Sequence, residues 1–170
     1  SWRKTIMTPI PKVLASTWFS EYRPISLHVA ICKLFLLVLL TRLQRFTEAQ
    51  QRVHNLQHGF RPGRSCPEAI LMLREIIESR KAQGLPTYLC FLDIRRAYDT
   101  VCRRGLLRRL FSVGVRGRLL RIIAALHTDD SARVRFESLL SAEFCFRAGV
   151  KQGDPIAPLL YILFIDPLFC

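Results

Sequence analysis

The chain has 170 residues, half of them apolar, which is enough for one sizeable hydrophobic core or for two small cores that share an interface. Basic residues outnumber acidic residues by 26 to 13, and 21 of the basic residues are arginine. This composition excludes a disordered chain. It favours a polyanionic partner such as nucleic acid, because the planar arginine fork suits bidentate contacts with phosphate. A solvated basic surface, or a face that docks on an acidic protein, would give the same balance.

Membrane, secreted and zinc-binding proteins are disfavoured. One of the longest uninterrupted apolar runs, residues 34–40, lies between Lys33 and Arg42 and is far shorter than the roughly 20 residues that span a bilayer. The N-terminus does not have the pattern of a secretory signal. The six cysteines include no C-x-x-C pair, and His54 and His58 have no third ligand beside them. We therefore expect reduced thiols in an intracellular protein, nuclear or cytoplasmic.

Two helices are predicted in the N-terminal half. The apolar residues between 25 and 46 have the spacing of an amphipathic helix that closes with two arginines in its last turn. The second helix begins with an S-x-x-E capping box at Ser65 and ends at Gly84. Its predicted buried stripe consists of Ala69, Ile70, Leu73, Ile76 and Ile77.

Asp93 is the residue on which the predicted chemistry depends. It follows residues 87–92, a short apolar run introduced by Pro86 and rich in strand formers, which predicts a buried central strand. A carboxylate at the end of such a strand is costly unless it is paired or binds a metal. Two interpretations are open from the residues alone: a salt bridge to Arg95 or Arg96, or a metal ligand at a strand end.

The remaining residues predict two helices, a hairpin and a loop that leads into a final helix. The helices cover residues 103–111 and 118–126, and residues 132–136 and 143–147 alternate as the strands of a hairpin would. Residues 149–170 predict a glycine-containing loop followed by an apolar helix with prolines near its first turn. Strands alternating with helices around a hairpin predict an α/β or α+β fold.

Four stretches, in chain order, resemble the motifs of reverse transcriptases. They read Y-R-P-I-S-L at 22–27, Q-H-G-F-R-P-G-R-S at 57–65, F-L-D-I-R-R-A-Y-D at 91–99 and G-V-K-Q-G-D-P-I-A-P at 149–158. The third is similar to the first palm motif, an apolar strand with a catalytic aspartate and an aromatic residue five positions later. The style of the motifs resembles non-LTR retrotransposon and group II intron enzymes more than retroviral ones. The resemblance extends over nearly the whole chain.

This resemblance implies a right-hand polymerase fold, with residues 1–86 in the fingers and residues 87–170 in an incomplete palm. Such an enzyme adds deoxynucleotides to a DNA primer paired with an RNA template, by phosphoryl transfer with two magnesium ions. Residues 2–12 resemble the strand-forming stretch that precedes the fingers. The second aspartate motif of the palm, the thumb and other retroelement domains are expected outside this chain, so the isolated chain is expected to be inactive.

The resemblance also implies roles for single residues. Asp93 and the main-chain oxygen of Ile94 would bind magnesium, which prefers oxygen ligands. Tyr98 matches the aromatic gate, whose ring would clash with a 2′-hydroxyl and so favour deoxynucleotides. Gln152 and Gly153 match the loop that touches the incoming nucleotide, because the amide can donate a hydrogen bond and glycine lets the backbone approach closely. The alternatives are an ordinary core tyrosine and a plain turn before a helix.

Several arginines are candidates for phosphate contacts. Arg61 and Arg64 resemble the fingers segment that contacts the triphosphate, and Arg23, Arg95 and Arg96 are candidates for contacts with the nucleic-acid backbone. Nine arginines fall within residues 95–121, for which template or primer backbone is the natural partner. A solvated turn or helix face is the alternative, particularly for the arginines at 103, 104, 108 and 109.

Asp129 and Asp130 form a tempting acidic pair. They precede the loop at residues 149–158 that carries Gln152, here called the glutamine loop, and they open the predicted hairpin, so we interpret both as turn residues. Asp99 resembles the closing carboxylate of its motif, with a structural role. Two other functions stay open: a non-catalytic relic or domesticated domain that binds RNA or protein, and an RNA-dependent RNA polymerase. Tyr98 argues against the second, because a bulky gate disfavours ribonucleotides.

Overall fold

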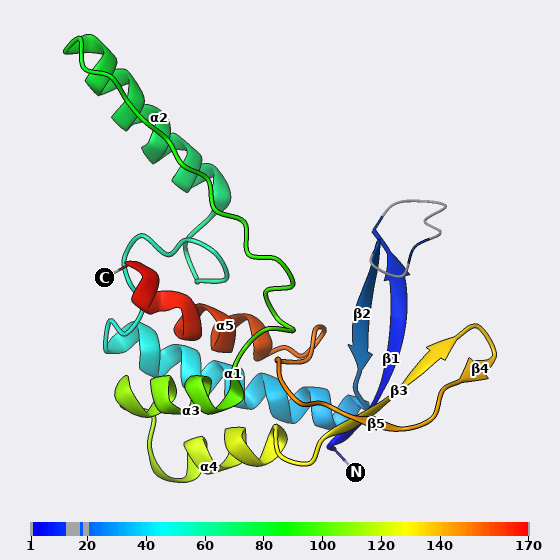
Figure 1. The fold of residues 1–170 in the computed structure, drawn as a ribbon. Coiled ribbons are helices and arrows are strands. Elements are labelled where there is room, and N and C mark those ends of the chain that lie inside the picture. The colour runs from blue at the N-terminus through cyan, green and yellow to red at the C-terminus, as the bar shows by residue number, and fades with distance from the viewer. Residues whose placement is uncertain (1, 13–17, 19–20, 170) are drawn as a thin grey trace.

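A β-sheet and a group of helices lie beside one another, and one long helix projects away from both (Figure 1). The computed structural model describes residues 2–12, 18 and 21–169. The elements, in chain order, are β1 Lys4–Pro11, β2 Tyr22–Leu27, α1 Ala30–Ala49, α2 Cys66–Ala82, α3 Arg103–Ser112, α4 Gly117–Leu126, β3 Ser131–Phe136, β4 Leu139–Leu140, β5 Phe144–Cys145, α5 Ala157–Ile165 and the 3-10 helix η2 Asp166–Phe169. The predicted mixture of helices and strands is confirmed.

The sheet joins two N-terminal strands to strands from the second half of the chain. Its strand order is β2-β1-β3-β4, and β5 pairs with β3 beside this path. β1 and β2 are antiparallel, with Ile6 opposite Leu27. β1 also runs parallel to β3, with Lys4 opposite Ser131, a pairing that no local pattern predicted. The predicted hairpin is confirmed in the antiparallel pairing of Ala132 with Phe144.

The hydrophobic core lies where α1, α3 and α5 pack together. α1 contributes Leu36, Leu39 and Leu43, which are three and four residues apart and therefore lie on one face of the helix. α5 is apolar on all sides and is mostly buried, as a central helix should be. Its first turn contains Pro158, and it ends at Ile165, before Pro167, as predicted. None of the helices in the described ranges combines the length and the apolar character needed to cross a membrane.

The first helix begins later than predicted. The predicted helix started at residue 25, but residues 22–27 form β2, and α1 begins only at Ala30. The backbone of this stretch has better partners in the sheet: Ile25 lies opposite Thr8 of β1, and the Ser26 N–H donates to the Gln152 carbonyl at 2.7 Å. Pairing with distant strands therefore overrides the local helical pattern.

The helix α2 has its predicted cap, but its predicted burial is wrong. Ser65 and Glu68 form the capping box, each side chain accepting the other residue's backbone N–H at 3.3 Å. None of the residues of α2 is buried, and Ile70 is 67% exposed. The reason is visible in Figure 1, where α2 projects away from the helical group. Its apolar stripe has no facing element among the described residues.

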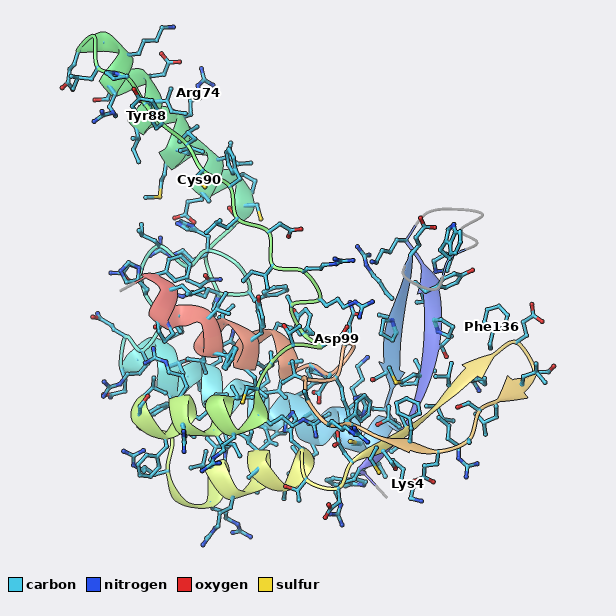
Figure 2. The ribbon with its side chains drawn as sticks, in the orientation of Figure 1. Lys4, Arg74, Tyr88, Cys90, Asp99 and Phe136 are labelled. Atoms are coloured by element: carbon cyan, nitrogen blue, oxygen red, sulfur yellow. The ribbon has the colours of Figure 1, made fainter. Side chains whose placement is uncertain are left out.

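The predicted central strand at residues 87–92 is also wrong. These residues carry no strand assignment and are largely exposed; the exposed fraction of Tyr88 is 90%. Figure 2 shows Tyr88 and Cys90 far from the sheet, along the part of the chain that returns from the far end of α2. A strand needs a neighbouring strand to pair its N–H and C=O groups, and within the described ranges no strand pairs with this segment.

Candidate functional site

A cleft of about 610 Å³ lies between the β1–β2 hairpin and residues 93–99. Asp99, labelled in Figure 2, lines this cleft where the segment that follows α2 reaches the helical group. Seven of the ten predicted site residues line it: Arg23, Asp93, Ile94, Arg95, Arg96, Tyr98 and Gln152. Three motifs that are far apart in the sequence therefore meet at one place.

Backbone hydrogen bonds hold the glutamine loop against the other two motifs. The Gly149 N–H donates to the Val101 carbonyl, and the Val150 N–H donates to the Tyr98 carbonyl, both at 2.9 Å. On its other side the loop accepts the Ser26 N–H at the Gln152 carbonyl. The loop is thus fastened both to β2 and to the segment that follows Asp93.

Two glycines make this close packing possible. Gly149 has a φ of +86°, and a Cβ there would lie 2.9 Å from the carbonyl oxygens of Tyr98 and Asp99. Gly153 has a φ of +100°, and a Cβ there would lie 2.8 Å from the Ser26 carbonyl oxygen. Both contacts are with backbone atoms, which cannot rotate away. Glycine is therefore required twice in the loop, for its backbone conformation and for its size.

Replacing Gly153 with alanine is expected to lower the free energy of unfolding by about 2 kcal/mol or more, because the left-handed backbone and the contact with Ser26 both oppose a side chain. Urea denaturation of the purified chain measures this loss. Gly84→Ala is the matched control, since Gly84 has a φ of +69° but nothing within 4 Å of its Cβ position. Its loss should be smaller, about 1 kcal/mol. If both substitutions lower the free energy of unfolding equally, the contact with the Ser26 backbone does not contribute to the loss at Gly153.

Asp93 lies in the cleft as an exposed carboxylate, and not as the buried strand end that the sequence predicted. It forms no ion pair within the described ranges, so the alternative of a salt bridge to Arg95 or Arg96 is not realised there. The side chain is available to a ligand. Burial raises the pKa of the Tyr161 phenol, and the negative charge of Asp93 raises it further.

The described residues supply only part of a metal site. No group of three His, Cys, Asp or Glu side chains within residues 2–12, 18 and 21–169 could hold a metal ion. The unpaired carboxylate of Asp93, next to the main-chain oxygen of Ile94, fits the oxygen-rich coordination of magnesium but leaves most positions unfilled. A magnesium ion at this place would need further ligands from elsewhere.

Tyr98 forms part of the cleft wall and is held from behind by α5. Its ring centroid lies 5.3 Å from that of Tyr161, with the ring planes tilted by 38°. Burial, and then the neighbouring Tyr161, raise the pKa of the Tyr98 phenol. The residue is half-buried. Tyr98 therefore packs against the core and also lines the cleft, so its position is compatible both with an aromatic gate and with a core tyrosine.

The charge in the cleft favours an anionic ligand. Lys12, Arg23, Arg95 and Arg96 line it, against the two carboxylates of Asp93 and Asp99. Arginine forks around a polar cleft suit the bidentate binding of phosphate oxygens. Arg96 also has a φ of +52°, an uncommon conformation for a residue with a side chain.

The structure does not bring Arg61 and Arg64 to the cleft. Arg61 is nearly buried and forms a bidentate pair with Glu48, at 3.0 and 2.7 Å, and this pair holds its pKa above the ordinary arginine value. Its guanidinium also donates to the His54 carbonyl at 3.0 Å. Arg64 pairs with Glu68 at 3.0 Å. In this structure both arginines hold together the loop between α1 and α2.

Two of the arginines for which phosphate or solvent was expected are instead paired with buried aspartates. Arg103 forms a bidentate pair with Asp130 at 2.6 and 3.1 Å, and Arg109 donates to Asp166 at 2.6 Å. Asp130 lies in the connection between α4 and β3, where a turn residue was predicted, but its side chain is fully buried in this ion pair. Asp129 is exposed and has a φ of +51°, as expected of the turn residue that the sequence predicted there. No local signal marked these pairs, because the partners are 27 and 57 residues apart.

Sequence reasoning also passed over two buried charges in the glutamine loop. Lys151 lies 3.4 Å from the Asp130 carboxylate. Asp154 accepts the Ile156 N–H at 3.2 Å, and burial raises its pKa to about 6. An aspartate that precedes a proline at the start of a helix is a common local cap, and this pattern could have identified the role of Asp154.

The raised pKa of Asp154 makes a prediction about pH. The pKa of the Asp154 carboxyl is higher in the folded chain than in the unfolded chain. Its contribution to the free energy of unfolding is therefore fully present below pH 3.8 and is lost as the pH rises through about 6. Asp154→Asn keeps an acceptor for the Ile156 N–H and stays neutral. We expect the variant to be more stable than the parent chain by about 2 kcal/mol above pH 7, and by much less near pH 4. Urea denaturation across this range measures the difference, and a difference independent of pH would contradict the prediction.

Comparison with known proteins places this chain in a family. The family described as "Reverse transcriptase (RNA-dependent DNA polymerase)" matches residues 10–170. The chain belongs to the reverse transcriptase family. The resemblance drawn from the four motifs is thereby confirmed.

Several relatives of this reverse transcriptase chain come from retrotransposons. It is 31% identical over 170 residues to a retrovirus-related Pol polyprotein from the type-1 retrotransposable element R2 of Popillia japonica, covering 99% of this chain and 23% of the relative. It is 32% identical over 146 residues to a probable RNA-directed DNA polymerase from transposon X-element of Drosophila melanogaster, covering 85% and 16%. It is 29% identical over 148 residues to an RNA-directed DNA polymerase from the mobile element jockey of Drosophila funebris, again covering 85% and 16%.

These relatives confirm the predicted membership of the non-LTR retrotransposon lineage. The chain spans less than a quarter of the length of each of the three. It is therefore similar to one portion of proteins that are much longer.

Proposed function

We propose that this chain forms the fingers and part of the palm of a retroelement RNA-directed DNA polymerase, with residues 1–86 in the fingers and residues 87–170 in the palm of a right-hand fold. One observation carries the proposal. One basic cleft collects Arg23, Gln152 and the pair Asp93 and Tyr98 from three motifs that are far apart in the sequence, and the Asp93 carboxylate has no ion pair among the described residues. The substrates would be an RNA template, a DNA primer and deoxynucleoside triphosphates.

Asp93 and the main-chain oxygen of Ile94 would supply part of the coordination of magnesium, together with ligands from outside the described residues. Magnesium, when bound, would activate the primer hydroxyl and stabilise the leaving pyrophosphate. The exposed position of Asp93 and the absence of an ion partner among the described residues support this role. A lone carboxylate cannot complete the octahedral coordination of two magnesium ions, so the isolated chain of 170 residues is expected to show no polymerase activity.

The other cleft residues would bind and select the nucleotide. Arg23, Arg95 and Arg96 would bind phosphate oxygens of the triphosphate or of the nucleic-acid backbone, because their forks border the cleft. Gln152 would donate its side-chain amide to the incoming nucleotide. Gly153 would keep that loop pressed against Ser26, where no side chain fits. Arg61 and Arg64 are used within the fold here, and the triphosphate contacts proposed for them would require these ion pairs to open.

Tyr98 gives the test of this function. In a protein that contains this chain, Tyr98→Val is expected to raise the incorporation of ribonucleotides relative to deoxynucleotides by about tenfold or more, because removing the ring makes room for a 2′-hydroxyl. Primer extension on an RNA template, with UTP compared against dTTP, measures the ratio. Tyr161→Phe is the control, since it keeps the ring packed against Tyr98 and should leave the ratio unchanged.

Two results would contradict the proposal in different ways. An unchanged nucleotide ratio in Tyr98→Val would remove the gate role but leave the polymerase function intact. The absence of magnesium-dependent incorporation by the parent protein would instead favour the non-catalytic relic that binds RNA or protein.

A further inference from the structure

The stretch from Arg103 to Leu126, which contains α3 and α4, is unusually basic. It contains seven arginines and no acidic residue. Three of the seven are used within the fold: Arg103 and Arg109 pair with buried aspartates, and Arg116 lies over the ring of Phe111, with its guanidinium carbon 3.3 Å from the ring centroid. The other four are exposed and form no ion pair within the described part of the chain: Arg104, Arg108, Arg118 and Arg121.

A groove of about 570 Å³ runs along this face between α3 and α4. Arg104, Leu107, Arg108 and Phe111 line it from α3, and Ala124 lines it from α4. The groove shares none of its residues with the polymerase cleft. Figure 1 shows α3 and α4 below α1 and α5. The cleft is lined instead by residues of β1 and β2. The α3–α4 groove is therefore separate from the polymerase cleft.

The two exposed arginines of the groove have no evident role in the fold. Arg104 and Arg108 are four residues apart on α3, so their side chains lie on the same side of the helix. Like charges at this spacing destabilise a helix by a few tenths of a kcal/mol. No carboxylate within the described ranges offsets them. An anionic ligand would relieve this repulsion, and two forks one helical turn apart suit successive phosphates.

Phe111 indicates which kind of anion fits. Its side chain is 53% exposed although it lines the groove, and Arg116 covers its ring. An exposed aromatic ring backed by a guanidinium is a platform on which an unpaired base can stack. An acidic protein would use the arginines but not the ring. A double helix would present phosphates but keep its bases stacked inside.

From these observations we infer that the α3–α4 groove binds single-stranded nucleic acid outside the polymerase cleft. Arg104 and Arg108 contact the phosphates, and a base stacks on Phe111. The shared chemistry is a flexible strand of phosphates with exposed bases, which both RNA and DNA provide. The inference concerns binding alone and does not depend on nucleotide incorporation, so it can fail while the proposed polymerase function stands.

The test is fluorescence anisotropy of labelled oligouridylate and oligothymidylate of about 12 nucleotides, a length within the range of known single-strand sites. Arg104→Gln/Arg108→Gln is expected to weaken binding of the purified chain about tenfold, and to reduce the slope of log affinity against log salt by about 1.4, or about 0.7 for each lost phosphate contact. The matched control is Arg74→Gln/Lys81→Gln on α2, which removes the same charge far from the groove. Figure 2 labels Arg74 on that projecting helix.

Phe111→Leu separates base stacking from charge. It is expected to weaken oligonucleotide binding severalfold while leaving the binding of heparin, a polyanion without bases, unchanged. If Phe111→Leu weakens the binding of oligouridylate more than that of oligothymidylate, the ligand is RNA, and the reverse result identifies DNA. Both results support the site. The inference is overturned if the α2 control weakens binding as much as the groove variant, or if Phe111→Leu has no effect. Competition by polyglutamate as strong as that by the oligonucleotides would also overturn it, in favour of an acidic protein partner. Circular dichroism checks the fold of each variant.

Discussion

Replacing Asp93 with asparagine in a protein that contains this chain is expected to reduce primer extension on an RNA template by about a thousandfold or more. The reason is that an amide is a poor ligand for a divalent cation, and the stabilisation of a transferring phosphoryl group by metal contributes several kcal/mol. Stability should not change, because the carboxylate is exposed and forms no ion pair among the described residues. Single-turnover extension with saturating deoxynucleotide measures the effect on chemistry.

Asp129→Asn is the matched control for this experiment. Asp129 is also an exposed aspartate, so the substitution removes the same charge, and asparagine tolerates the positive φ at that position. Extension by this variant should equal that of the parent protein. If Asp93→Asn retained activity within about tenfold of the parent, Asp93 would not bind the catalytic metal.

Replacing Asp130 with asparagine is expected to lower the free energy of unfolding by about 3–5 kcal/mol, since breaking a buried ion pair leaves a charge without compensation. The Asp130 carboxylate is fully buried between two cations: Arg103, at 2.6 and 3.1 Å, and Lys151, at 3.4 Å. Asparagine would leave both cations in a poorly hydrated site. Urea denaturation of the purified chain near pH 7 measures the loss.

The same substitution should also weaken the packing of the loop that carries Gln152. Arg103 also donates to the Gly149 carbonyl at 2.9 Å, so the same guanidinium connects α3, the start of β3 and the loop that carries Gln152. The double variant Arg103→Met/Asp130→Leu removes both charges of the bidentate pair and should recover part of the lost stability. A change below about 1 kcal/mol in Asp130→Asn would show that water reaches this pair.

The elements that were predicted correctly are those whose signals are local. The capping box at Ser65 places the start of α2, because Ser65 and Glu68 satisfy each other's backbone N–H groups without help from the rest of the fold. The helices α3 and α4 lie within a residue of their predicted bounds. Two of the wrong predictions concern burial. The stripe of α2 and the run at residues 87–92 have the composition of buried elements, but burial depends on a facing element that local composition does not specify.

The amino-acid sequence by itself determined the family, the order of the motifs and the residue types that line the cleft, since these are properties of short segments. Only the tertiary structure decided which charges are free. The arginines at 61, 103 and 109 look the same in sequence as those at 95, 104 and 108, yet the first three are held by Glu48, Asp130 and Asp166. An ion pair joins residues that are distant in the chain, so its formation depends on how the elements pack and not on local pattern.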